Sequence, residues 1–78
     1  MIEGRLVLNN ANNRYGLFGT DSFEHDGFHC GEGMEVLYHR KWIQTRIEMD
    51  WTAQGQFWYL VGTPYYGNLE NVIARIRA

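Results

Sequence analysis

The sequence predicts an all-β fold, a small closed or nearly closed barrel of five or six short strands. No segment longer than about ten residues keeps a helical period, whereas short runs of β-branched and aromatic residues recur between turn signals. Barrel closure would remove the sheet edges that a chain with 15% aromatic residues would otherwise expose. With a length of 78 residues, we expect one domain that covers residues 1–78.

The N-terminal part contains two predicted strands and a long loop. Residues 5–8 form the first strand, which an Asn-rich turn at residues 9–13 closes. Residues 15–18 form a weaker second strand, which Gly16 interrupts. Residues 19–33 are polar and punctuated by glycines, so we expect an irregular hairpin loop there.

The middle of the chain predicts a hairpin. Residues 34–39 read as a strand, and the tight turn at residues 39–41 leads into a second one. From residue 42 to residue 49 the side chains alternate between a mostly apolar face, which includes Ile43 and Ile47, and a face that begins with Trp42.

The C-terminal part predicts one clear strand and one ambiguous segment. The turn Ala-Gln-Gly lies within residues 50–56, and the aromatic run at residues 57–61 has high β-propensity. A loop at residues 62–68 contains the only proline, Pro64. The end of the chain favours a short strand at residues 72–77, although a short helical turn near the C-terminus also fits the pattern.

Two stretches resemble the middle and the end of SH3 and bacterial SH3-like domains. They are DGFHCGEGMEVLYHRKWIQTRIE and WYLVGTPYYGNLENVIARI, in which an acidic loop leads into an apolar strand and a tight turn precedes a Trp-led strand. The overall pattern of strands and turns is also similar to that of a family of short bacterial domains of unknown function associated with mobile elements. The resemblance implies an SH3-like barrel in which Trp42 is the ligand-facing tryptophan, with Pro64 and Tyr66 beside it. The Ala-Leu-Tyr-Asp-Tyr signature of peptide-binding SH3 domains is absent.

The aromatic residues outnumber those that a small barrel can bury, and Trp42 lies opposite the apolar set of its own strand. We therefore expect a non-catalytic module that binds a protein or peptide on a floor of Trp42, Pro64, Tyr65 and Tyr66. In the alternative interpretation these rings only cap the ends of the barrel.

An acidic loop accompanies this floor. Five carboxylates and no Lys or Arg lie between residues 21 and 35. Glu24 and Asp26 are expected to select a basic partner by charge. The alternatives are a simple solvated loop, or an acidic inhibitor that occupies a DNA-binding partner.

Basic residues suggest a second function. Together with aromatic rings, they would form a stripe that holds single-stranded nucleic acid, as in an accessory barrel. The residues of this stripe are Arg40, Lys41, Arg46, Arg75 and Arg77. Scattered surface charge is the competing explanation.

The stretch around Cys30 contains thiol and imidazole groups but no metal or catalytic spacing. A structural zinc site needs four ligands in paired short spacings, and a nucleophile needs a base within hydrogen-bond reach. We expect Phe28 and Cys30 to pack inward and His29 to face out. No metal, no cofactor and no enzymatic activity are expected.

Composition limits the remaining classes. The net charge of −2 argues against a general phosphate-binding surface. No apolar run is long enough to span a membrane, and the start of the chain lacks the apolar core of a signal peptide. A single cysteine suits a reducing compartment, so we expect a cytoplasmic protein.

Overall fold

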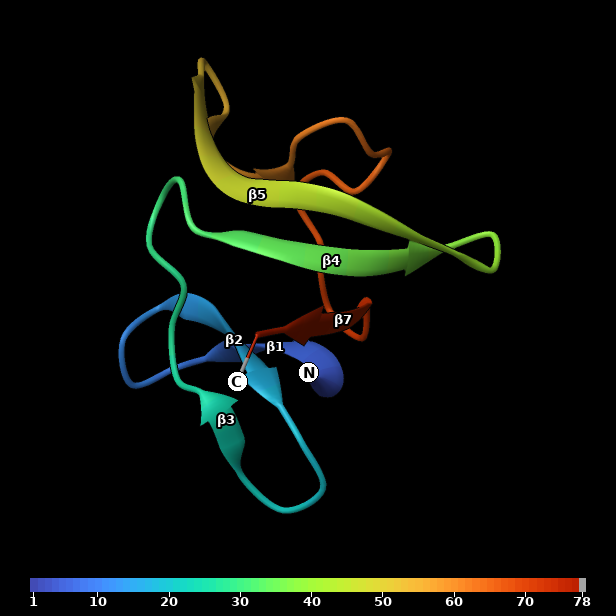
Figure 1. Cartoon of the computed structure of the whole chain (residues 1–78). Coiled ribbons are helices and arrows are strands. Elements are labelled where there is room, and N and C mark those ends of the chain that lie inside the picture. Colours follow the sequence, from blue (N-terminus) through green and yellow to red (C-terminus); the bar gives the residue numbers. More distant parts are fainter. Residues whose placement is uncertain (78) are drawn as a thin grey trace.

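The computed structural model describes residues 1–77, which form seven antiparallel strands and no helix. The sheet is ordered β3-β2-β1-β7-β4-β5-β6, and it curls into a half-barrel (Figure 1). The strands are β1 (Ile2–Asn9), β2 (Arg14–Phe18), β3 (Phe23–His25), β4 (Gly33–Tyr38), β5 (Lys41–Thr52), β6 (Gly55–Leu60) and β7 (Ile73–Ile76). The all-β prediction is therefore confirmed, whereas the prediction of five or six strands was too low.

The additional strand is β3, which lies inside the predicted loop at residues 19–33. It pairs with β2 across a register shift between Leu17 and Phe18. The rings of Phe18 and Phe23 meet edge to face, with centroids 5.2 Å apart. A strand of three residues between polar neighbours is too short to show an alternating pattern, so the sequence gives no signal for it.

The C-terminal segment contains a turn and a strand, and the helical turn that also fitted its sequence does not form. Asn71 adopts a left-handed φ of 67° and donates its N–H to the Leu6 carbonyl at 2.8 Å. In return the Leu6 N–H donates to the Val72 carbonyl at 2.8 Å. These bonds guide β7 between β1 and β4, where it pairs with both strands. Pairing with β1 and β4 thus selects the strand at the C-terminal segment, where local propensity allowed either a strand or a helical turn.

The core lies on the inner face of the curled sheet. Strand β5 alternates as predicted, with Thr45 and Ile47 buried and Gln44 and Arg46 exposed. The Thr45 hydroxyl is satisfied because it donates to the Val61 carbonyl at 2.6 Å. The buried apolar side chains are Leu6, Tyr15, Leu17, Phe28, Met34, Val36, Ile47, Leu60, Leu69, Val72 and Ala74.

The segment between β3 and β4 corrects one packing prediction. Phe28 is 1% exposed, as expected, but Cys30 is exposed and does not pack inward. The prediction assumed an extended chain with alternating sides. Instead the segment turns, with Gly31 at a φ of 91° and its N–H donating to the Ile47 carbonyl at 2.8 Å. Alternation does not hold through such a turn.

Strands β3 and β6 form the two edges of the sheet, and they are not paired with each other anywhere in the described part of the chain. The barrel is therefore open. Past β6, a loop adds one isolated bridge between Tyr59 and Tyr66, so within the described residues the β6 edge has no neighbouring strand before Trp58. No helix within the described range is long and apolar enough to cross a membrane.

Candidate functional site

Three rings gather on the outer face of the sheet at the β6 edge. Strand β6 alternates, so Leu60 points inward and Phe57 and Tyr59 lie on the outer face. The Tyr59–Tyr66 bridge places the Tyr66 ring on the same face. Its centroid lies 5.7 Å from that of Phe57 and 5.9 Å from that of Tyr59. We call Phe57, Tyr59 and Tyr66 the outer aromatic cluster.

Two acidic residues of β5 flank this cluster. The hairpin register pairs Glu48 with Tyr59 and Asp50 with Phe57. The Tyr66 hydroxyl reaches across β6 and donates to Asp50 Oδ2 at 2.9 Å. This hydrogen bond, together with the charge of the carboxylate, raises the pKa of Tyr66 above its ordinary value of 10.0. The cluster therefore combines one exposed and two half-buried rings with the carboxylate of Asp50.

Of the four residues of the predicted aromatic floor, Tyr66 belongs to this cluster. It is 49% exposed. Its neighbour Tyr65 is half-buried against the core, and its hydroxyl donates to the Leu37 carbonyl at 3.3 Å. Pro64 is exposed in the turn that precedes them. Adjacent residues on an extended segment point to opposite sides, which separates Tyr65 from Tyr66.

Trp42 lies on the outer face but away from the cluster. It is the second residue of β5 and is half-buried beneath Arg75, whose guanidinium lies 4.0 Å from the ring centroid. Arg75 in turn donates to Glu35 at 2.6 Å. Trp42 is separated from Glu48 by six residues of β5, or about 20 Å of strand. The structure therefore does not bring Trp42 and Tyr66 together.

Glu24 and Asp26 are exposed, but they lie on and beside the opposite edge of the sheet. In Figure 1, β3 and the loop that follows β6 are at opposite ends of the molecule. The acids beside the rings are instead Asp50 and Glu48. The signal that would have found them is the turn at Ala53–Gln54, because counting back from it gives the pairing of β5 with β6.

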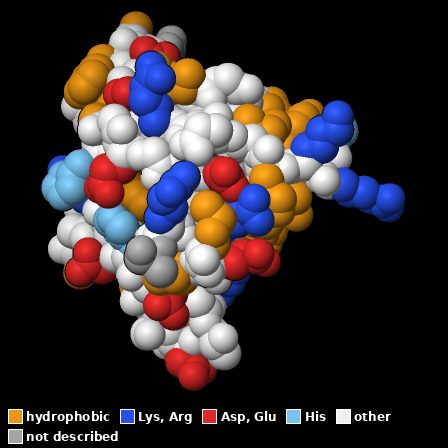
Figure 2. Space-filling view, viewed as in Figure 1, with side chains coloured by type: hydrophobic (Ala, Val, Ile, Leu, Met, Phe, Trp, Pro, Cys, Tyr) orange, Lys and Arg blue, Asp and Glu red, His pale blue; other side chains and the backbone are white. Residues whose placement is uncertain are grey.

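The five predicted basic residues do not form one free stripe. Arg46 pairs with Glu48 at 2.9 Å, and Arg75 pairs with Glu35. Arg40 and Lys41 lie at the exposed tip of the β4–β5 hairpin, where Figure 2 shows basic side chains that project into solvent. Two of the five cations are therefore neutralised by carboxylates, and Arg77, which directly follows β7, lies apart from this tip.

Hydrogen bonds among His25, Gly27, His29 and Glu32 hold the loop that contains the histidines and Cys30 in place. Within residues 1–77 no three or more His, Cys, Asp or Glu side chains gather as metal ligands would. His25 stacks on Phe28 with centroids 4.1 Å apart, and its Nδ1 accepts the Gly27 N–H at 3.2 Å. Its Nε2 therefore donates to Glu32, at 3.0 Å. Glu32 also accepts the His29 N–H at 2.7 Å, which closes the loop.

The hydrogen bonds of this loop favour the charged form of Glu32. Burial raises the pKa of the carboxyl, but hydrogen bonds from the His29 N–H and from His25, with attraction to both imidazoles, outweigh burial. The pKa of Glu32 therefore lies below its ordinary value of 4.5. A carboxylate with a depressed pKa stabilises the fold above its unfolded pKa, and this contribution is lost as the pH falls through the folded pKa.

We expect Glu32→Gln to remove this pH dependence. Urea denaturation from neutral pH to below pH 4.5 would measure the free energy of unfolding of both proteins. At neutral pH the native protein should be more stable than Glu32→Gln by at most about 1 kcal/mol, because the His25–Glu32 pair is partly exposed. The difference should shrink in acid. A difference that is constant down to the lowest pH would contradict the assignment.

A protein-family model described as "Domain of unknown function (DUF5348)" matches residues 4–76. The matched residues include β5, β6 and Tyr66, which form the outer aromatic cluster and its surroundings, and also the loop that contains Glu32. No curated protein and no solved structure gives a significant match.

Proposed function

We propose that the chain, which belongs to the DUF5348 family of domains of unknown function, is a non-catalytic module that binds a basic segment of a partner protein. The binding surface is the outer aromatic cluster. The observation that carries the proposal is a group of three rings beside Asp50, in which Tyr66 is 49% exposed and Phe57 and Tyr59 are half-buried. The adjoining edge of β6 has no neighbouring strand before Trp58 in the described part of the chain.

The chemistry of this surface favours Arg or Lys side chains. Tyrosine is among the residues that dominate interaction hot spots, and the faces of Tyr59 and Tyr66 attract cations. Asp50 uses Oδ2 for the Tyr66 hydroxyl, and Oδ1 remains an acceptor for a guanidinium. Asp50 thus takes the part in charge selection first expected of Glu24 and Asp26, whereas Glu48 is already paired with Arg46.

The backbone of β6 supplies a second means of binding. On the side away from β5, the Gly67 N–H donates to the Trp58 carbonyl and the Leu60 N–H donates to the Tyr65 carbonyl. Among the described residues no strand covers β6 before Trp58. An extended partner segment can pair there, as in recognition by strand addition, and place alternate side chains on the rings.

We also propose that the half-barrel belongs to the SH3-like class and that the protein acts in the cytoplasm. The loop that passes through Phe28 and Glu32 into β4, and the tight turn before a Trp-led β5, support the first statement. The exposed free thiol of Cys30 supports the second.

The test begins with short random peptides displayed and selected against the native protein. Selected peptides should be rich in Arg or Lys. Tyr66→Ala should weaken their binding at least about tenfold, as expected for a hot-spot residue. Titration calorimetry or fluorescence anisotropy with a synthetic peptide would measure this.

The matched control is Trp51→Ala. Trp51 is 67% exposed and lies on β5 next to Asp50, so its side chain points to the opposite face of the same hairpin. This variant removes a large exposed ring without touching the cluster, and binding should stay unchanged. Equal losses in both variants, or a loss in Trp51→Ala alone, would place the site elsewhere.

A further inference from the structure

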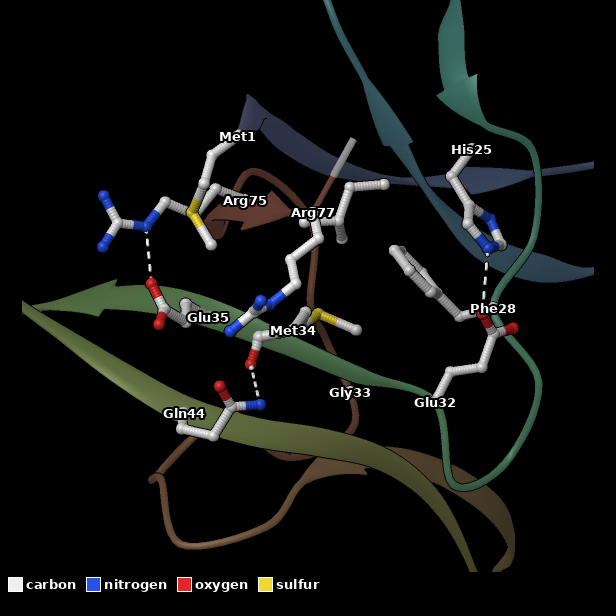
Figure 3. A pocket seen from close by; sticks show the side chains of 11 residues that line it. Met1, His25, Phe28, Glu32, Gly33, Met34, Glu35, Gln44, Arg75 and Arg77 are labelled. Atoms are coloured by element: carbon white, nitrogen blue, oxygen red, sulfur yellow. Dashed lines mark hydrogen bonds and ion pairs between the residues drawn. The ribbon is translucent and has the colours of Figure 1, made fainter.

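A pocket of about 390 Å³ opens where β4 and β7 separate. The two strands pair at Glu35 and Val36, and at Gly33 and Met34 strand β4 keeps its pairing with β5 but not with β7. The loop after β3 forms the opposite wall (Figure 3). None of the three rings of the outer aromatic cluster lines this pocket, so it is a separate feature of the molecule.

The floor of the pocket is apolar. Phe28 is 1% exposed and Met34 is 3% exposed, so other side chains cover nearly all of their surface. The apolar lining that a ligand can reach is Ile76, which is half-buried, and Met1, which is 62% exposed. An apolar group of a ligand would lie against Ile76 and Met1 and lose its contact with water. The volume is within the range of small-ligand pockets and accommodates a group of about the size of one amino acid residue.

The carboxylates around the pocket already have partners. Glu32 accepts from His25 and from the His29 backbone, and Glu35 accepts from Arg75. Figure 3 shows these two ion pairs on opposite sides of the cavity.

Arg77 is the arginine of the lining that has no carboxylate partner among the described residues. Its side chain reaches across the pocket toward Met34 and Gln44 (Figure 3). Within residues 1–77 it makes no ion pair and no side-chain hydrogen bond. Its planar guanidinium presents paired N–H donors, which match a carboxylate in a bidentate arrangement.

Gln44 adds an acceptor beside this cation. Its Nε2 donates to the Met34 carbonyl at 3.2 Å and to the Thr45 carbonyl at 3.3 Å. The amide is therefore held in one orientation. No donor in the described part of the chain reaches its Oε1, so this oxygen is available to a ligand N–H.

We propose that this pocket binds a monocarboxylate that has an apolar side chain and a neighbouring amide N–H. The carboxylate pairs with Arg77, the amide donates to Gln44 Oε1, and the apolar side chain lies against Ile76 and Met1 above the buried Phe28 and Met34. Two sources present this chemistry, the C-terminal residue of a peptide and a free N-acylated amino acid. The proposal is independent of the outer aromatic cluster and goes beyond the function proposed for it.

The test uses N-acetyl-leucine, N-acetyl-leucinamide and a short peptide that ends in leucine, each added to isotope-labelled protein. Amide shifts followed by NMR should move at Gly33, Met34 and Arg77 with N-acetyl-leucine. The amide analogue lacks the carboxylate and should bind at least about tenfold more weakly, because hydrogen bonds to charged groups are the strong ones. Tighter binding of the peptide would assign the site to protein C-termini, and equal binding would assign it to small acids.

Arg77→Gln should weaken N-acetyl-leucine binding by a similar factor, and its exposed position makes loss of the fold an unexpected result. The matched control is Arg40→Gln, which removes the same charge from the tip of the β4–β5 hairpin and should leave binding unchanged. Equal binding of the acid and its amide would overturn the proposal, as would shifts confined to residues outside the pocket. Loss of binding in both variants would show an effect of net charge and would also overturn it. If N-acetyl-leucine fails to bind, the outer aromatic cluster is not affected, because the peptide selection and Tyr66→Ala test it separately.

Discussion

Phe28→Ala should unfold most of the protein at room temperature. The Phe28 ring is 1% exposed, His25 stacks on it, and its N–H donates to the Tyr15 carbonyl at 2.8 Å. Removing a buried phenylalanine ring costs about 3–5 kcal/mol. A core in a chain this short supplies about the same amount of stability. Circular dichroism during urea denaturation would show a large unfolded fraction before denaturant is added.

Two variants of the same segment serve as controls. Phe28→Leu keeps most of the apolar volume and should remain folded with a smaller loss of stability. Cys30→Ala changes an exposed side chain two residues away and should have a stability within about 0.5 kcal/mol of the native protein. If Phe28→Ala were as stable as Cys30→Ala, the inward position of this ring would be wrong.

Gly16→Ala should have the second largest effect on stability. A Cβ at this position would collide with the His25 carbonyl oxygen and would lie 2.9 Å from Phe23 Cδ1 and 3.0 Å from the Asp26 carbonyl carbon. Two of these atoms are backbone, so the clash is relieved only if β2 and β3 move apart. We expect a loss of about 1–3 kcal/mol in the free energy of unfolding, measured by urea denaturation.

Gly33→Ala is the matched control, because Gly33 also lies in a strand. A Cβ there would meet the Gln44 amide nitrogen at 3.4 Å and no backbone atom closer than 3.6 Å. We expect a change of less than about 0.5 kcal/mol. Equal effects at the two glycines would mean that β2 and β3 do not approach each other as described.

Much of the fold follows from local pattern. The alternation through β5 identified its buried face, and the signals for the β4–β5 and β5–β6 turns were strong. Strand β3 and the open edges of the sheet could not be predicted from local pattern, because they depend on which distant segments pair. The insertion of β7 between β1 and β4 is fixed by hydrogen bonds between Leu6 and residues 71–72, which no local pattern encodes.

Of the four residues of the predicted aromatic floor, the structure places only Tyr66 in the outer aromatic cluster. Its function as a binding surface stays a prediction. The acids beside this cluster are Asp50 and Glu48, because the register of a hairpin, rather than closeness in sequence, decides which side chains meet. Trp42 is half-buried beneath Arg75, and its position on β5, about 20 Å of strand from Glu48, separates it from the cluster.

The most direct test of the proposed function is to map the binding surface of a selected basic peptide by NMR on isotope-labelled protein. We expect the largest amide shift changes at Phe57, Tyr59 and Tyr66, with smaller changes along β5 at Asp50. The same peptide should leave the amides of residues 21–26 and of Trp42 nearly unmoved. Largest changes at residues 21–26, or at Trp42 and Arg75, would contradict the assignment of binding to the outer aromatic cluster.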